Sequence, residues 1–267
     1  MYIIPSEFKD FISPDCNRID FIQKYLSSSG LECPIMQIEG KNHLYVKFPQ
    51  NQYDSMFKIK TVIAHYDRIG IGANDNSAAV FCLMQWACRL VRSNIRHNIR
   101  LVFTDGEELG NNGVEEQGAF ALAKVFKRLG ITNDDIFVFD CMGRGDVPIL
   151  AQTQLNAKVS QSFIKDFSAL EQRAQNIIQQ AAGGRWFKLV CSWSDNAGFI
   201  ANGIPAVAIT MLPSNEINDV LSGIRPFTWQ ILHSQQDNID TLSPVSFEIF
   251  NEILNNLAKH KTLPPLK

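Results

Sequence analysis

Apolar residues along the chain follow two patterns, one typical of amphipathic helices and the other of buried strands. Helical spacing, with apolar residues three or four positions apart, marks the segments 17–29, 76–91, 117–129, 157–182 and 244–257. Short, nearly continuous apolar runs indicate strands covered on both faces, and they occur at 59–64, 99–104, 136–140 and 206–210. Two further strands, 34–38 and 43–48, lie on either side of Gly40 and are expected to pair as a hairpin.

Helical and strand segments follow one another along the chain, as they do in proteins with a parallel sheet between two layers of helices. We therefore predict an α/β fold with a mostly parallel sheet and helices on both faces. No internal repeat, low-complexity tract or linker divides the sequence. The whole chain, residues 1–267, is expected to form a single domain, because this length lies within the range of one large α/β core.

Composition and charge are those of an ordinary globular protein, with 45% hydrophobic and 19% charged residues. A net charge of -2 and a pI near 6.2 give no indication of a nucleic-acid or anionic-membrane partner. The first 15 residues are a poor match to a signal peptide, and no apolar run approaches the about 20 residues of a membrane span. The cysteines lack CxxC spacing and are expected to be reduced. These features together predict a cytoplasmic enzyme.

Potential metal ligands stand at the ends of successive buried strands. His65 follows one strand, Glu107 and Glu108 follow the next after a short loop, and Asp140 closes a third. Asp75 lies in the loop that enters the helix 76–91. Because sites in open α/β sheets form beyond the carboxyl ends of the strands, we expect these side chains to meet at one rim of the sheet.

The residue types in this set suit zinc, which binds histidine nitrogen and carboxylate oxygen. The candidate ligands are His65, Asp75, Glu108, Asp140 and His233. One bridging carboxylate and two terminal ligands per metal would account for all of them on two ions. The adjacent Glu107 would remain as general base for a hydroxide that bridges the metals. Two metals about 3.5–4 Å apart with such a base indicate a hydrolase of the aminopeptidase type.

Each candidate also has an ordinary structural interpretation. An aspartate before a helix, as at position 75, is commonly an N-cap, and one at a strand end, as at position 140, commonly forms a turn. Asp67 suits a partner that fixes the tautomer of the His65 ring, but a turn aspartate is an equal alternative. The conjunction of ligand types at one predicted rim favours a metal site. The remaining histidines lack a partner pattern and are expected to be structural: His43, His97 and His260.

Several segments of the chain form a set of motifs: AHYD (64–67), GANDNSA (72–78), FTDGEELG (103–110), FDCMGR (139–144), WSDNAGFIANGIPAV (193–207) and LHSQQDNIDTL (232–242). Taken together, these segments resemble the co-catalytic zinc aminopeptidases, a family typified by bacterial leucyl aminopeptidases. The resemblance runs from about residue 58 to the C-terminus.

This resemblance implies a role for each ligand. Asp75 would bridge two zinc ions, His65 and Asp140 would complete one metal site, and Glu108 and His233 would complete the other. The fold that it implies is a three-layer α/β/α sandwich with a mixed, mostly parallel central sheet.

The resemblance also implies how the catalytic groups act. Glu107 would serve as general base and acid, and Asp67 would be the partner of the ring of His65. The substrates would be peptides with a free N-terminus, from which a single residue is removed.

Two departures of the sequence from the family pattern lie close to the predicted site. Asn196 stands where members often have histidine, and we expect Asp195 to be a helix cap or loop anchor instead of a ligand. The stretch 111–118 is longer than the usual turn and could reshape the substrate pocket, with its Glu115 and Glu116 solvated.

A further expectation concerns the pocket wall. We expect it to draw on an irregular segment, 212–231, with Phe227 and Trp229 as apolar candidates.

Two other functions fit parts of this pattern. Glutaminyl cyclases are single-zinc relatives with the same fold and a similar DGEE motif. Leu232, where cyclases tend to place tryptophan, and Asn76 after Asp75 favour the peptidase. A non-catalytic binding domain on the same scaffold is the third hypothesis, and the complete ligand set together with Glu107 argues against it.

Overall fold

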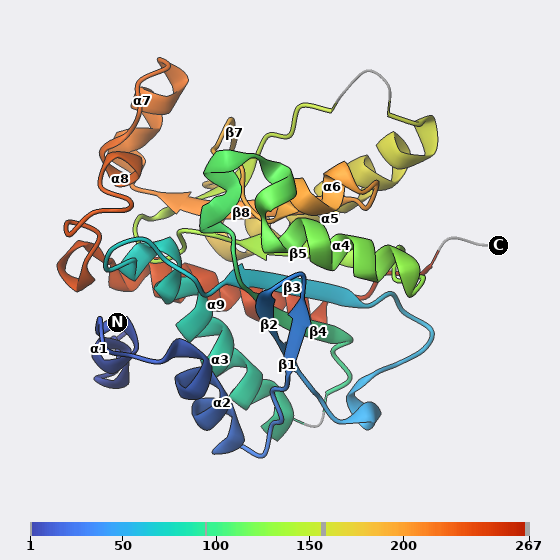
Figure 1. Ribbon diagram of the computed structural model, residues 1–267. Helices are drawn as coiled ribbons and strands as arrows, with labels where there is room; N and C mark the ends of the chain where they lie inside the picture. The colour runs from blue at the N-terminus through green and yellow to red at the C-terminus, as the bar shows by residue number, and fades with distance from the viewer. Residues whose placement is uncertain (1, 94, 156–158, 265–267) are drawn as a thin grey trace.

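The computed structural model describes residues 2–93, 95–155 and 159–264 of the chain. Within these residues, eight strands form one sheet in the order β1-β2-β4-β3-β5-β8-β6-β7 (Figure 1). The strands are β1 (Ile35–Ile38), β2 (Lys41–Val46), β3 (Lys60–His65), β4 (Ile99–Thr104), β5 (Asp135–Phe139), β6 (Val147–Ala151), β7 (Phe187–Leu189) and β8 (Ala206–Leu212). The central strands β4, β3, β5 and β8 are parallel, whereas β1, β2 and β6 each pair antiparallel with a neighbour. The predicted mixed, mostly parallel sheet is confirmed.

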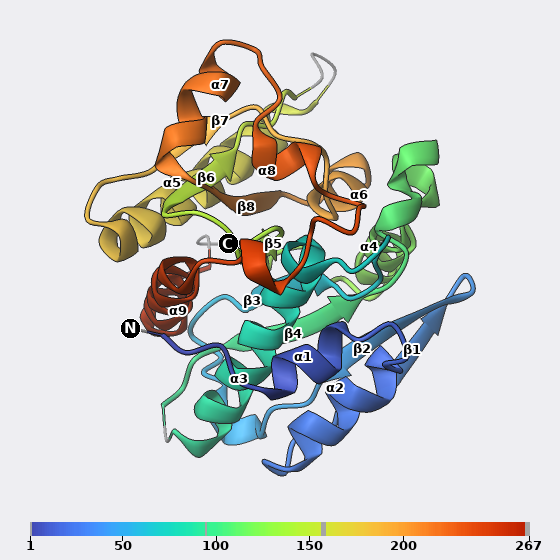
Figure 2. The same ribbon diagram turned by 90° about the vertical axis from the view of Figure 1, so that its left-hand side faces the viewer.

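Helices cover both faces of this sheet (Figure 2). The longer helices are α2 (Arg18–Ser27), α3 (Ala78–Arg92), α4 (Gly118–Arg128), α5 (Gln161–Ala182) and α9 (Pro244–Lys259). The shorter ones are α1 (Glu7–Ile12), α6 (Asn196–Ala201), α7 (Ile217–Leu221) and α8 (Phe227–Gln230).

Alternate residues of each central strand face opposite layers, as the pleat of a strand requires. Val62 and Ala64 of β3 pack in the core that α1, α2, α3, α5 and α9 share. Ile63, between them, packs in the second core with α4 and α6. Every residue of β3 is buried, which explains why its sequence reads as one apolar run instead of alternating. The predicted three-layer α/β/α arrangement is confirmed.

The elements that sequence patterns did not predict are short or interrupted. The segment 212–231, expected to be irregular, contains α7 and α8, which are too short to show a helical period. Strand β6 contains Pro148, a residue that argues against a strand in sequence because it lacks an N–H. The predicted helix 157–182 is present from Gln161, and residues 156–158 lie outside the described part.

The six cysteines are all free thiols. None of the helices that the structure describes is both long and apolar enough to cross a membrane.

Candidate metal centre

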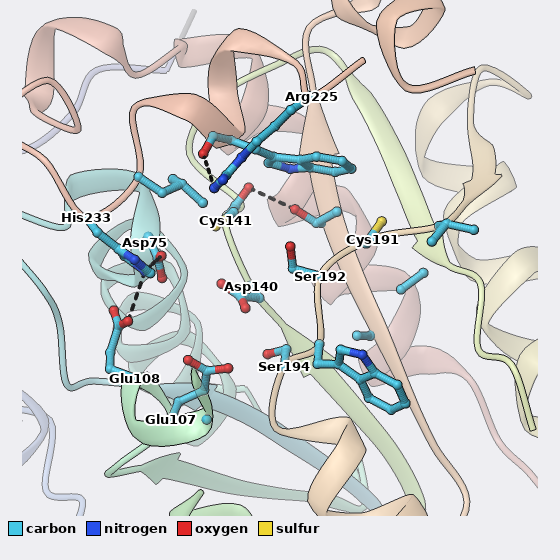
Figure 3. A pocket seen from close by; sticks show the side chains of 18 of the residues that line it. Asp75, Glu107, Glu108, Asp140, Cys141, Cys191, Ser192, Ser194, Arg225 and His233 are labelled. Atoms are coloured by element: carbon cyan, nitrogen blue, oxygen red, sulfur yellow. Dashed lines mark hydrogen bonds and ion pairs between the residues drawn. The ribbon is translucent and has the colours of Figure 1, made fainter. Parts of the chain in front are cut away.

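The candidate ligands gather at the carboxyl ends of the central strands, and Figure 3 shows Asp75, Glu108, Asp140 and His233 among them. Among the described residues, two groups could each hold a metal ion: His65 with Asp75 and Asp140, and Asp75 with Glu108 and His233. Within each group, one ligand atom per residue lies within 4.8 Å of the others. Asp75 belongs to both groups, so the structure places it centrally between the other four.

Asp75 directs its two carboxylate oxygens toward different histidines. Its Oδ1 lies 3.2 Å from His65 Nε2, and its Oδ2 lies 3.2 Å from His233 Nε2. His65 Nε2 is also 3.5 Å from Asp140 Oδ1, and His233 Nε2 is 2.9 Å from Glu108 Oε2. One carboxylate is therefore placed to contact two cations, one through each oxygen.

Two buried polar atoms of this cluster lack a hydrogen-bond partner in the described part of the chain and are suited to bind a metal ion. His65 Nε2 and Asp140 Oδ1 are buried and make no hydrogen bond with the described residues. Buried polar atoms are rarely left unpaired, because the loss of water costs about 1–3 kcal/mol per group. The other ring nitrogen, His65 Nδ1, lies 3.2 Å from the carbonyl oxygen of Asp67, which can only accept. That contact assigns the proton to Nδ1 and leaves the Nε2 lone pair directed at the carboxylates.

The charges of the cluster also fit a bound cation. Burial raises the pKa of Glu107 well above its ordinary value, and Asp140 adds to the shift against the opposing effect of His65. Burial and the neighbouring Asp75 likewise raise the pKa of Glu108 to about 7. No lysine or arginine of the described residues forms an ion pair with these carboxylates. A divalent cation would supply the positive charge that the protein does not.

Asp67 holds the loop of the two glutamates. Its Oδ1 accepts the backbone N–H of Glu107 at 3.2 Å, and its Oδ2 accepts that of Glu108 at 3.0 Å. The same Oδ1 lies 3.5 Å from His65 Nδ1. Asp67 is thus beside the His65 ring, as the sequence suggested, and has an additional task that spacing did not reveal.

Asp237 is a site residue that sequence reasoning missed. Its carboxylate accepts the backbone N–H groups of Asn74 at 2.8 Å and Asp75 at 3.1 Å. It is fully buried, and this burial raises its pKa to about 6. Asp237 therefore ties the segment after His233 to the turn that carries Asp75, whose peptide bond to Asn76 is cis. The position of an aspartate four residues after a candidate ligand was the available signal.

Gln117, in the stretch 111–118, was also missed. Its side chain is buried, and its Nε2 donates a hydrogen bond to Glu107 Oε1 at 3.1 Å. Gly110 makes room for it, since a Cβ atom at that position would lie 2.6 Å from Gln117 Nε2. Glu115 and Glu116 are exposed, as expected. The longer stretch brings an amide donor to the carboxylate that the sequence proposed as general base.

Of the two roles expected for Asp195, helix cap or loop anchor, the contacts support the second. Asp195 occupies the N-cap position of α6, but its side chain makes no capping hydrogen bond. Its carboxylate instead accepts a hydrogen bond from Thr104 Oγ1 at the end of β4, so it anchors the loop to the sheet. Burial raises the pKa of Asp195 to about 7. Asn196 is buried beside it and belongs to neither group of metal-binding residues.

A cavity of about 970 Å³ opens over the cluster, which is large enough for a short peptide. Trp229 lines it, as expected, together with Gly113, Val114 and Gln117 of the longer stretch. Phe227 does not, and this expectation was wrong. The guanidinium of Arg144 lies over its ring instead, 5.3 Å from the ring centroid.

Comparison with known proteins places the chain in a family. The model of peptidase family M28 matches residues 44–258, and the chain belongs to this family. No curated protein matched the sequence significantly.

Solved structures of similar fold have different activities. The Legionella pneumophila LapA aminopeptidase is 14% identical, with a TM-score of 0.69 over 97% of this chain and 75% of its own. A Zn-dependent exopeptidase from Parabacteroides distasonis is 14% identical, with a TM-score of 0.69 over 96% and 95% of the two chains. The Porphyromonas gingivalis glutaminyl cyclase is 17% identical, with a TM-score of 0.66 over 95% and 94%. These similarities show a shared fold.

Proposed function

We propose that this M28 chain is a zinc-dependent aminopeptidase that removes one residue from the free N-terminus of a peptide. The observation that carries the proposal is Asp75, which two ligand groups share, with Glu107 beside them and outside both. Zinc fits the donor set of histidine nitrogen and carboxylate oxygen. We propose two ions per chain: one held by His65, Asp75 and Asp140, the other by Asp75, Glu108 and His233.

Glu107 is the group best placed to move protons. It is not needed as a ligand, it lines the cavity, and the burial that raises its pKa suits a general base at neutral pH. Glu107 takes a proton from the attacking water and delivers it to the departing amine. Zinc ions in this centre would polarise the scissile carbonyl and lower the pKa of that water.

Other residues keep this constellation in place. Asp67 fixes both the ring of His65 and the loop of the two glutamates. Gln117 holds one oxygen of Glu107, and the other oxygen stays available to the water. We also propose that residues 1–267 work as one domain, since strands from residue 35 to residue 212 join a single sheet.

A cyclase that closes N-terminal glutamine into a ring is the second candidate, because a glutaminyl cyclase shares the fold over 94% of its length. The aminopeptidase is favoured because both ligand groups are complete. His65 Nε2 and Asp140 Oδ1 lie 3.5 Å apart, close enough to contact one ion, in addition to the group around His233.

Product analysis separates the two candidates. The purified chain should release free leucine from a leucyl peptide and should leave the N-acetylated peptide intact, because acetylation removes the free amine. With an N-terminal glutamine peptide it should release glutamine and no ammonia. Ammonia together with a ring-closed peptide, and no release of leucine, would reject the aminopeptidase. Glu107→Gln is the matched control for a contaminating peptidase.

A further inference from the structure

Arg225, in the segment between α7 and α8, differs from every other charged group that lines the cavity. The described lining contains the carboxylates of Asp75, Glu107, Glu108 and Asp140, the imidazole of His233, and Arg225 as its only lysine or arginine. Figure 3 shows Arg225 on the side of the pocket opposite Glu107 and Glu108, with Asp140 between them. A permanent positive charge therefore faces the candidate metal centre across the cavity.

A hydrogen bond within the turn orients the exposed side chain of Arg225. Its Nη2 donates a hydrogen bond to the carbonyl oxygen of Trp229 at 2.7 Å, and its own carbonyl oxygen accepts one from Gln230 Nε2 at 2.6 Å. These contacts use one of the five N–H donors of the guanidinium. The backbone of α8 thus holds the side chain over the cavity, and most of its donors stay free for a ligand.

Arg225 has no carboxylate partner among the described residues, unlike Arg144 and Arg173 elsewhere in the fold. Arg144 pairs with Glu216 at 3.3 Å, and Arg173 pairs with Asp135 at 2.8 Å. Arg225 lines the same cavity as several carboxylates and pairs with none of them. Ile224 and Val220 line the cavity near it in sequence, so its surroundings in the pocket are partly apolar.

We infer that Arg225 binds a carboxylate of the substrate and selects peptides that carry one a short distance beyond the scissile bond. This inference rests on the proposed function. A guanidinium binds a carboxylate through two parallel hydrogen bonds, which an amide cannot reproduce. The carboxylate is either the C-terminus of a dipeptide or the side chain of an acidic second residue. A cavity of about 970 Å³ accommodates both.

Three peptides distinguish these sources: Leu-Gly with a free C-terminus, Leu-Gly-amide, and Leu-Glu-amide. The wild type should have a kcat/KM for at least one carboxylate peptide about 10-fold or more above that for Leu-Gly-amide, as expected for a charge-assisted pair. Preference for Leu-Gly identifies the C-terminus, and preference for Leu-Glu-amide identifies the side chain. Equal values for all three peptides would overturn the inference.

Substitution of Arg225 tests whether this residue is responsible. In Arg225→Gln, the ratio of kcat/KM for carboxylate over amide should fall to about 1, and Arg225→Lys should keep part of it. Arg128→Gln, which removes an exposed arginine from the end of α4, is the charge-matched control and should keep the wild-type ratio. An unchanged ratio in Arg225→Gln refutes the inference. If that variant does not fold, a wild-type ratio in Arg225→Lys refutes it instead, because lysine lacks the two-pronged geometry.

Failure of the proposed function gives a different result. If the chain closes rings instead of hydrolysing peptides, leucine is not released from any of the three substrates. Gln-Gly and Gln-Gly-amide then replace the leucyl pair, and ring closure is measured. The ratio of kcat/KM for Gln-Gly over Gln-Gly-amide, and its loss in Arg225→Gln, then test Arg225 in ring closure as well.

Discussion

The two ends of the parallel strands both bury carboxylates, and they compensate the charge in different ways. At the amino ends, Asp135 is 1% exposed and lies 2.5 Å from Lys58 Nζ and 2.8 Å from Arg173 Nη2. Beside it, Asp134 pairs with Arg100 and accepts a hydrogen bond from Thr61 at 2.6 Å. Each carboxylate there has a cationic partner from the protein.

At the carboxyl ends, the carboxylates face histidines and one another. Asp75, Asp140 and Glu108 have only His65 and His233 as basic partners within the described residues. Since a buried charge without a partner is costly, such a cluster persists where something else supplies the compensating charge. The comparison teaches that carboxylates paired with lysine or arginine stabilise the fold, whereas those without such a partner form the proposed metal centre.

Glu107→Gln changes a carboxylate at the carboxyl ends of the strands, and we expect it to have the largest effect. Glutamine preserves the size of the side chain but cannot accept the proton of water. The value of kcat should fall by about 10²–10⁴, the usual contribution of general acid–base catalysis. Zinc content and the melting temperature should stay at wild-type values. A variant that loses its zinc would instead show that Glu107 is a ligand.

Asp140→Asn removes a carboxylate from the unpaired cluster. Loss of an outer partner of a metal ligand commonly lowers affinity by about 10–100-fold, so loss of a ligand should lower the affinity of one zinc by more than about 100-fold. The metal-free variant should melt at or above the temperature of the metal-free wild type, because one of several mutually repelling groups is gone. Wild-type zinc affinity in this variant would remove Asp140 from the centre.

Asp135→Asn is the matched change at the opposite rim of the sheet. It should lower stability and leave zinc affinity unchanged. Lys58 and Arg173 would lose their common partner, which should reduce the free energy of unfolding by on the order of 3 kcal/mol. Denaturant unfolding measures this loss. Zinc affinity should remain that of the wild type, because the site lies at the other end of the strands. A variant of normal stability would contradict the structural role of the paired rim.

Gln117→Leu is expected to have the smallest effect. It tests whether the hydrogen bond from Gln117 to Glu107 contributes to catalysis. The substitution removes the N–H donor to Glu107 Oε1 and replaces the amide with an apolar side chain of similar size. We expect kcat to fall by about 10-fold, the value of one hydrogen bond to a charged group, with KM and zinc content nearly unchanged. Glu116→Gln, an exposed neighbour, should behave as wild type. A rise in KM alone would assign Gln117 to substrate binding instead.

The sequence predicted the central strands and the long helices because burial on both faces and amphipathic spacing leave strong periodic signals. It also predicted that His65, Glu108 and Asp140 meet at one rim of the sheet, since each follows a parallel strand. Strand β6 gave no such signal because it contains a proline. The helices α7 and α8 gave none because each is about one turn long, too short to show a helical period.

The supporting contacts could not be found from spacing. Asp237 holds the turn of Asp75 across 162 positions of the sequence, and only the folded chain brings them together. Gln117 reaches Glu107 because the longer stretch folds back over Gly110, which depends on backbone geometry. Asp195 was expected to cap a helix or to anchor a loop, and only the folded chain identifies Thr104 on β4 as its partner.

The central claim, that the unpaired carboxylates form a centre for two zinc ions, is tested most directly by zinc titration. Metal-free protein is titrated by calorimetry, and peptidase activity is measured at each ratio of zinc to chain. The account predicts binding of about two equivalents, with full leucyl-peptidase activity reached at the second. Saturation at one equivalent with full activity would contradict it.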